Sequence, residues 1–412
     1  MSRINRRQFI QRSAIAAAGV SLAQSTAFAS IAINPAPKKI VIIGAGMAGL
    51  VAGYELSQLG HDVTILEAQT RAGGRVQTLR DPFSDGLYAE AGAARIPDDH
   101  DLTLKYVKLF GVPLEPMYPS RLSALRVAGD SRREVSMDAF TDGLAEYFGP
   151  EFRGPTRFSK VKGGNDNLPK AFAQRLAAKI SYGSPVVKIE QDAHGARVTF
   201  LDKGKPQTVS GDRILCAVPF SVLRNLELPA DFSERRRRII KNLEYASVSR
   251  VYLQAKKRSW EVKGLNGFAL TSEAVEIWQP TWNQPGPRGI LMTYNRPGQA
   301  ERIAEMKESE RISSTLTQMG SWFPGLTENF ERGATKCWVE DEWARGAWSF
   351  VLPKDFETAS SPAGRIHFAG EHLSPWPSWM QGALASGLRA VKEINEAAEV
   401  RSAALGRSLF AF

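Results

Sequence analysis

The chain has 412 residues, of which 43% are hydrophobic and 23% charged, and its formal net charge is +10. This length is enough to bury a large core divided between two lobes, while the charge excess is too small to mark a nucleic-acid-binding surface. No apolar run reaches the length of a membrane span, and two cysteines with five scattered histidines offer no metal-ligand spacing. We therefore expect a globular protein without a metal, a nucleic-acid partner or stable membrane insertion.

The N-terminus has the pattern of an export signal. Arg6 and Arg7 form a twin-arginine pair, residues 14–22 are rich in alanine, and Ala27 and Ala29 are small residues of the kind that a signal peptidase recognises. We expect residues 1–29 to be a twin-arginine signal peptide cleaved after Ala29. The twin-arginine export machinery is then a partner, and the mature protein is periplasmic or secreted. An amphipathic helix retained in the cytosol is the alternative.

The next segment predicts a dinucleotide-binding unit. A short apolar strand at residues 40–43 leads into a G-x-G-x-x-G turn formed by Gly44, Gly46 and Gly49. In such a turn the first glycine permits the bend, the second lets a pyrophosphate approach the backbone, and the third lets the following helix lie close to the strand. Glu67 ends the next strand, where its carboxylate can accept hydrogen bonds from ribose hydroxyls. This pattern disfavours NADP but does not separate NAD from FAD.

Residues 71–75 make that separation, because two glycines stand between two arginines. The glycines let the backbone approach a phosphate, and a guanidinium can neutralise it. At this point the sequence resembles the flavin-dependent amine oxidase superfamily, whose FAD fingerprint continues from the glycine turn through E-A-x-x-R-x-G-G-R. The resemblance implies that Arg71, Gly74 and Arg75 contact FAD.

The C-terminal part carries two further motifs of the same superfamily, F-A-G-E and W-M-x-G-A-x-x-S-G. The resemblance implies that Glu371 holds ribityl or pyrophosphate-side groups and that the backbone N–H of Met380 reaches the flavin carbonyl edge. It also implies that Val187 presents its backbone to the adenine. Monoamine oxidases have a flavin-linked cysteine at the position of Ala347, so we expect FAD to be bound non-covalently.

Four residues are implied to face the substrate. Arg95 lies in a G-x-x-R-[IL]-P pattern similar to that of L-amino-acid oxidases, in which the arginine clamps the substrate carboxylate; contact with FAD or with an acidic neighbour is the alternative. Trp348 and Trp379 are expected to form two aromatic walls in front of the flavin. Trp278 stands near the position of a tyrosine that assists carboxylate binding in amino-acid oxidases, although a packing role is as well supported.

A lysine is also expected near the flavin. Relatives have a lysine shortly before a tryptophan, bonded through water to flavin N5, and here Lys256 fits the spacing to Trp260 better than Lys257 does. A cation at that place stabilises the reduced flavin. We therefore name Lys256, Arg95, Trp348 and Trp379 as candidate catalytic residues.

The resemblance implies an α/β fold (α+β overall), with a Rossmann-type FAD domain and a mixed sheet and helix substrate-binding lobe. We expect the FAD domain to comprise residues 36–100, 181–222 and 335–400, the substrate-binding lobe residues 101–180 and 223–334, and a C-terminal tail residues 401–412.

The function expected on this resemblance is oxidation of L-amino acids to 2-keto acids, with hydride transfer to FAD and with molecular oxygen as the acceptor, releasing ammonia and hydrogen peroxide. Three alternatives stay open: a primary amine or polyamine oxidase, an amino-acid 2-monooxygenase, and a flavin dehydrogenase that passes electrons to a quinone or a protein. The sequence leaves open which amino acid or amine is the substrate and whether the chain forms a homodimer.

Overall fold

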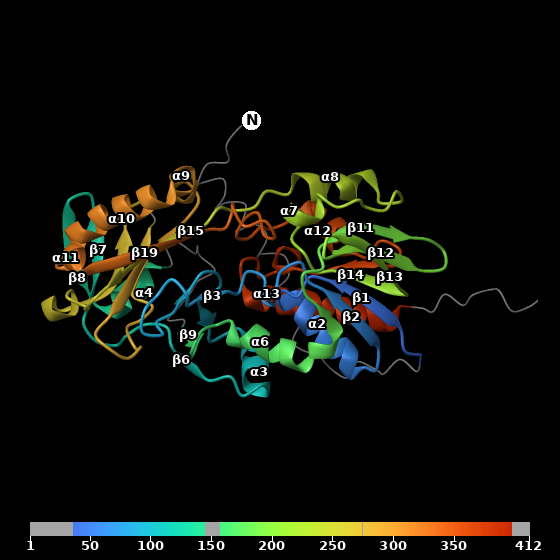
Figure 1. Cartoon of the computed structure of the whole chain (residues 1–412), viewed down its shortest axis with the longest axis horizontal. Helices are drawn as coiled ribbons and strands as arrows, with labels where there is room; N and C mark the ends of the chain where they lie inside the picture. The colour runs from blue at the N-terminus through green and yellow to red at the C-terminus, as the bar shows by residue number, and fades with distance from the viewer. Residues whose placement is uncertain (1–35, 145–156, 274, 398–412) are drawn as a thin grey trace, which may run out of the picture.

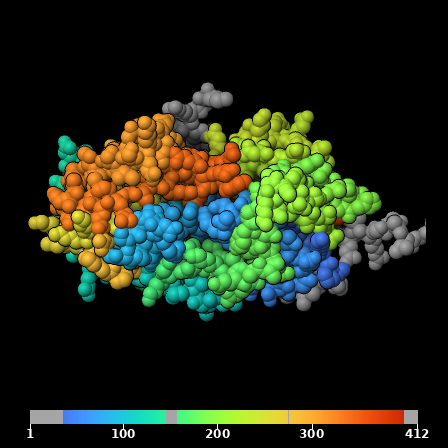
Figure 2. Space-filling view, in the orientation of Figure 1, coloured from blue at the N-terminus to red at the C-terminus, as the bar shows by residue number. Residues whose placement is uncertain are grey.

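The computed structural model describes residues 36–144, 157–273 and 275–397. The predicted signal peptide (residues 1–29) and C-terminal tail (residues 401–412) lie outside these ranges. The molecule is elongated, with two lobes side by side along its long axis (Figure 1). In the space-filling view the lobes form one continuous surface, and blue segments from early in the chain lie beside orange and red segments from its last part (Figure 2).

The first lobe is built on a five-stranded parallel sheet in the order β10-β2-β1-β14-β20. Its strands come from distant parts of the chain: β1 (Lys39–Ile43), β2 (Asp62–Leu66), β10 (Ile180–Ser181), β14 (Arg213–Cys216) and β20 (Ile366–Phe368). In register, Ile43 lies beside Leu66 and Cys216, so the carboxyl ends of the central strands share one edge. Ligands of open parallel sheets bind outside that edge. The predicted α/β fold with a discontinuous Rossmann-type unit is confirmed.

Both faces of this sheet are covered. Ile40 and Ile42 face a core formed with helices α2 (Met47–Gln58), α3 (Asp101–Leu109), α6 (Asn167–Arg175) and α13 (Met380–Glu396). Val41 and Ile43 face the opposite core, because side chains of a strand alternate between its faces. That core contains the antiparallel strands β11 (Val186–Gln191) and β12 (Ala196–Asp202), which continue into β13 (Lys205–Gly211), and helices α7 (Phe220–Leu223), α8 (Glu234–Asn242) and α12 (Pro353–Ser360).

The second lobe is a seven-stranded mixed sheet in the order β19-β15-β18-β17-β16-β7-β8. Its strands are β7 (Ser123–Ala128), β8 (Ser131–Val135), β15 (Ser249–Ala255), β16 (Leu265–Thr271), β17 (Glu276–Trp278), β18 (Gly289–Asn295) and β19 (Phe330–Cys337). One face packs against α10 (Glu308–Trp322) and α11 (Leu326–Asn329), with α9 (Gln299–Glu305) at its end. The other face buries Tyr252, Trp278 and Met292 toward the first lobe.

The remaining elements of the described ranges are short. They are β3 (Thr78–Leu79) with β4 (Ala89–Glu90), the antiparallel set β5 (Ile96–Pro97), β9 (Phe158–Val161) and β6 (Leu114–Pro116), helix α4 (Met137–Gly143), and the 3₁₀ helices η1 (Ala177–Lys179), η2 (Glu261–Lys263) and η3 (Glu371–Leu373). No helix in the described ranges is both long and apolar enough to cross a bilayer.

Three helices that were expected in the substrate-binding lobe pack on the first lobe. Helices α3 and α6 were expected in the substrate-binding lobe, but their apolar faces share the core of β1 and α2. Helix α8 was also assigned to that lobe, yet Ile240 packs with β14 and β20. Burial of these amphipathic faces therefore places most of residues 101–113, 161–180 and 223–243 on the first lobe, and the chain crosses over between α8 and β15.

Candidate active site

The glycine turn has the geometry that the sequence predicts. Gly44 adopts φ +99°, a backbone conformation that L side chains rarely take. A Cβ atom at Gly49 would lie 2.0 Å from the carbonyl oxygen of Gly44, whereas a Cβ at Gly46 would have no atom within 4 Å. The fold therefore requires glycine at the first and third positions. At Gly46 it leaves open space at the N-terminus of α2, where a pyrophosphate would lie.

Glu67 is turned toward this loop. Its side chain is buried and accepts hydrogen bonds from the backbone N–H groups of Ala45 (2.7 Å) and Gln69 (2.8 Å). Burial raises the pKa of Glu67, while these N–H groups and Arg71 oppose that shift. Each carboxylate oxygen has a second lone pair, so both oxygens can still accept from ribose hydroxyls.

The predicted phosphate-binding segment lies against the glycine turn. A Cβ at Gly74 would be 3.4 Å from the Cα of Gly46. Arg71 donates from Nη2 to the carbonyl oxygen of Gly74 (2.9 Å), but its Nη1 is buried and has no hydrogen-bond partner among the described residues. A buried guanidinium nitrogen without a partner is costly. An anionic cofactor group at this place would satisfy it, so these residues fit FAD.

Arg75 and Glu371 join the turn to the C-terminal motif. Arg75 donates from Nη1 to Glu371 (2.9 Å) and to the carbonyl oxygen of Ala347 (2.7 Å). Glu371 also accepts from the backbone N–H groups of Ser349 (3.3 Å) and Ser378 (2.8 Å). Burial raises the pKa of Glu371, which Arg75 counteracts. This pair fixes the loop that leads into α13.

Two other predicted cofactor contacts stay predictions. Helix α13 begins at Met380 without a side-chain cap, which leaves its N-terminus available for a polar group. Val187 is 37% exposed and lies at an irregularity of β11, where its carbonyl oxygen accepts from the N–H of Glu227 (3.0 Å).

The two tryptophans predicted as aromatic walls pack against different apolar clusters. Trp379 packs at the edge of one apolar cluster and Trp348 at the edge of another. Leu79 and Tyr294 pack against both clusters, so the two clusters adjoin, and the pair of aromatic walls stays a prediction. Trp379 also meets the ring of His100 edge to face, with centroids 4.9 Å apart.

Three arginines surround two stacked rings. Trp278 and Tyr294 stack with their centroids 5.2 Å apart. The guanidinium of Arg95 lies 4.3 Å from the Trp278 ring, and those of Arg250 and Arg296 lie 4.9 and 5.0 Å from the Tyr294 ring. We call Arg95, Arg250 and Arg296 the arginine cluster.

Two members of the arginine cluster bind the carboxylate of Glu276. It accepts from Arg95, from Arg296 (2.5 Å) and from Nε1 of Trp278 (3.0 Å). Burial by itself would raise the pKa of Glu276, but Arg95 and Arg296 outweigh burial and hold the pKa at about 2. Glu276 is therefore ionised, and the two arginines that bind it exceed its charge by one.

Arg95 pairs with an acidic neighbour, and such a contact was the alternative to its role in binding the substrate carboxylate. Its guanidinium binds Glu276 from Nη2 and donates from Nε to the hydroxyl of Tyr118 (2.6 Å). The role of Arg95 as a carboxylate clamp stays a prediction, and a substrate carboxylate would have to share or replace this ion pair.

The placement of Lys256 near the flavin stays a prediction. Lys256 and its alternative Lys257 are both exposed, in the turn after β15. The buried cation of this strand is Arg250, which is 3% exposed and donates to the carbonyl oxygen of Glu90 (2.5 Å). Spacing to Trp260 located the end of the strand, but it did not show which strand residue faces the other lobe.

We expect Arg250→Met to lower kcat by about 10²-fold, because removing a buried cation near a reacting centre has an effect of this size. Lys256→Met should change kcat by less than about twofold, since a solvated lysine contributes little. Steady-state kinetics of the two holoenzymes at matched flavin content decide between them. A large effect of Lys256→Met with none of Arg250→Met would support the sequence-based assignment.

Sequence analysis missed Glu276, Arg250 and Tyr294. A usable signal existed in the alternation of the strands: Glu276 and Trp278 lie two residues apart on β17, as do Met292 and Tyr294 on β18. Residues two apart share one face of a strand. That Arg95 meets this face depends on pairing between distant segments.

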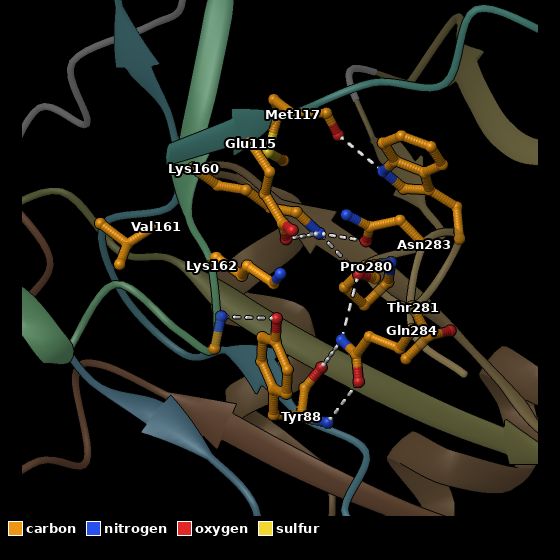
Figure 3. A network of polar contacts seen from close by, with 12 residues as sticks. Tyr88, Glu115, Met117, Lys160, Val161, Lys162, Pro280, Thr281, Asn283 and Gln284 are labelled. Carbon is orange, nitrogen blue, oxygen red and sulfur yellow. Dashed lines mark hydrogen bonds and ion pairs between the residues drawn. The ribbon is translucent and has the colours of Figure 1, made fainter. Parts of the chain in front are cut away.

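A small cavity of about 20 Å³ lies beside Trp278, between the ion pairs and a polar network. Its wall includes Lys160, whose Nζ donates to the carbonyl oxygen of Pro280 and to Oδ1 of Asn283, both at 3.0 Å, and lies 3.4 Å from Glu115 (Figure 3). Burial lowers the pKa of Lys160, and Glu115 opposes this shift. Gln284 adds hydrogen bonds to the backbone of Tyr88 (Figure 3). The network holds the loop after β17 in place.

Glu90 lines the same cavity, and burial raises its pKa from 4.5 to about 7. The folded state therefore favours the protonated carboxyl. The raised pKa contributes up to about 3 kcal/mol to the free energy of unfolding. This contribution is complete below about pH 4.5 and is lost as the pH rises through about 7. We expect Glu90→Gln to remove this part of the pH dependence of thermal unfolding. Parallel wild-type and variant curves from about pH 5 to about pH 8 would contradict the assignment.

Comparisons with known proteins agree with this geometry. A family profile described as "Flavin containing amine oxidoreductase" matches residues 47–136 and 122–395. The flavin-dependent L-tryptophan oxidase RebO of Lentzea aerocolonigenes is 28% identical over 87% of this chain and 98% of that protein. The L-amino-acid oxidase of Demansia vestigiata is 25% identical over 88% of this chain and 88% of that protein. Wild-type putrescine oxidase bound to putrescine superposes with a TM-score of 0.74 at 20% identity, over 87% of this chain and 99% of that chain, which concerns the fold alone.

Proposed function

Because the chain belongs to the flavin-containing amine oxidoreductase family, we propose that it is an FAD-dependent L-amino-acid oxidase. The observation that carries the proposal is the charge of the arginine cluster, in which Arg95 and Arg296 both bind the carboxylate of Glu276 and Arg250 lies against the neighbouring Tyr294 ring. An amine without a carboxylate would bring a further positive charge to this cluster. An α-amino acid brings a carboxylate that the cluster attracts.

The cofactor would be held without a covalent bond. Glu67 would bind the ribose, Arg71 and the glycine turn the pyrophosphate, and the segments joined by Arg75 and Glu371 the flavin side. Ala347 offers no nucleophile for a covalent link. Bound FAD supplies the hydride acceptor for oxidation of the Cα–N bond.

The residues of the chain would bind and orient the substrate. Arg95, aligned by Tyr118 and by the Trp278 ring, would take the carboxylate, and the region between Trp348 and Trp379 would receive the side chain. The amine would react in its neutral form. Release and hydrolysis of the imino acid then give the 2-keto acid and ammonia, with hydrogen peroxide formed from oxygen.

Matched substrate pairs test this function directly. Hydrogen peroxide release by the wild-type holoenzyme is measured with L-amino acids and with the amines that lack only the carboxylate, such as L-tryptophan and tryptamine. Turnover confined to the amino acids is the expected result. Turnover confined to the amines would identify an amine oxidase, the alternative in which Arg95 serves only to pair with Glu276.

We also propose that residues 1–29 direct export by the twin-arginine route, which carries folded proteins and would allow FAD to be taken up first. The support is the sequence pattern of Arg6, Arg7 and Ala29. Determining the N-terminus of the exported protein tests the proposal, and a retained Met1 would reject it.

A further inference from the structure

Arg95 is the residue that we expect to bind the substrate carboxylate. In this structure it pairs with a carboxylate of the protein itself, that of Glu276. Its side chain is completely buried, and that of Arg95 is 5% exposed. The two residues come from different segments, since Arg95 lies between β4 and β5 and Glu276 begins β17. The pairing of the strands that flank Arg95 and Glu276 therefore sets the relative position of the two residues.

Glu276 does not depend on Arg95 alone. Arg296 and the indole N–H of Trp278 also donate to it, at 2.5 and 3.0 Å. A buried carboxylate that lost every partner would cost several kcal/mol. Because two donors would remain, Glu276 can release Arg95 without becoming an unpaired charge.

Arg95 is also held in position by residues other than Glu276. The Tyr118 hydroxyl accepts from its Nε at 2.6 Å, and the Trp278 ring lies 4.3 Å from its guanidinium. The cavity beside Trp278 measures about 20 Å³, which is room for roughly one water molecule and not for an amino acid. A ligand that reaches Arg95 from this side must displace a neighbouring group, while Tyr118 and Trp278 keep the guanidinium aligned.

We propose that Glu276 is a specificity-determining residue that competes with the substrate carboxylate for Arg95. On binding, the substrate carboxylate replaces Glu276 on Arg95, and Glu276 stays on Arg296 and Trp278. One carboxylate is exchanged for another, so Arg95 is never left unpaired. A ligand without a carboxylate cannot make this exchange, and the site discriminates against it. This inference rests on the proposed function, because it assumes that the ligand carries a carboxylate.

The test measures binding of indole-3-acetate, a carboxylate without an amine to oxidise, through the change that it causes in the visible spectrum of the bound flavin. Glu276→Gln keeps the size of the side chain and removes its charge. We expect Kd for indole-3-acetate to fall by about tenfold, and KM for L-amino acids to fall in parallel with a smaller change in kcat. A purely structural role predicts weaker binding in the variant.

Glu340→Gln is the matched control, because it removes a carboxylate from another ion pair, that with Arg311. Its Kd should equal that of the wild type. Equal or weaker binding by Glu276→Gln, at wild-type flavin content and unfolding temperature, overturns the proposal.

A structure of the wild-type holoenzyme with indole-3-acetate gives a second test if Glu276→Gln does not fold. Arg95 on the ligand, with Glu276 on Arg296, supports the exchange; bound ligand with the Arg95–Glu276 pair intact overturns it. The binding assay also separates this inference from the proposed function. Tighter binding by Glu276→Gln in a protein that oxidises no amino acid would retain the exchange and reject the function. If the wild type oxidises amino acids but Glu276→Gln binds indole-3-acetate no more tightly, the proposed function is retained and the exchange is rejected.

Discussion

Replacement of Arg95 by methionine should lower kcat/KM for L-amino acids by about 10³-fold. Losing one partner of a buried, hydrogen-bonded charge pair costs roughly 3–5 kcal/mol, and each 1.4 kcal/mol corresponds to about a tenfold change. The loss should appear mainly in KM, because binding of the carboxylate contributes to the ground state as well as to the transition state. Steady-state peroxide release with L-tryptophan and tryptamine measures it.

Arg95→Lys is the matched variant, since it keeps the charge but loses the planar fork that binds a carboxylate bidentately. It should recover only part of the affinity. Flavin content and thermal unfolding accompany the kinetics, because Arg95 also pairs with Glu276. Unchanged turnover of amino acids in Arg95→Met would reject the carboxylate clamp, and an equal loss for both substrates would assign Arg95 to the structure of the site.

Gly46→Val should give a folded protein without flavin. A Cβ at Gly46 meets no atom of the chain within 4 Å, and its φ is not in the left-handed region, so the fold tolerates a side chain there. The added methyl groups would fill the space that a pyrophosphate needs at the N-terminus of α2. The ratio of visible flavin absorbance to protein absorbance after purification measures the loss, which we expect to exceed about tenfold.

Gly195→Ala is a suitable control, because its Cβ would make only an ordinary contact, 3.5 Å from the carbonyl oxygen of Gly211, in the hairpin between β11 and β12. It should retain wild-type flavin content. Full flavin content in Gly46→Val, with normal far-ultraviolet circular dichroism, would place the cofactor elsewhere. Gly49→Ala makes a poorer test, since the added atom would clash with Gly44 and disturb the fold itself.

Much of the cofactor site could be predicted because its determinants are local. The order of strand, glycine turn and helix between β1 and α2 follows from residues a few positions apart, and so does Glu67 at the end of β2. Gly74, which the resemblance assigned to the cofactor, lies beside Gly46 of this turn. Backbone conformation and close approach at glycines are short-range properties, which a sequence pattern records directly.

The substrate side depended on contacts that no local pattern contains. Arg95 and Glu276 are 181 positions apart, and neither position shows that the other will neutralise it. All seven residues of β15 are buried, so alternation could not show that Arg250 faces the site while Lys256 lies beyond it. The sequence by itself determined the family, the parallel fold and the turn that would receive the cofactor. Only the tertiary structure decided which charges meet beside Trp278, because that depends on how distant strands pair and on which buried groups must then neutralise one another.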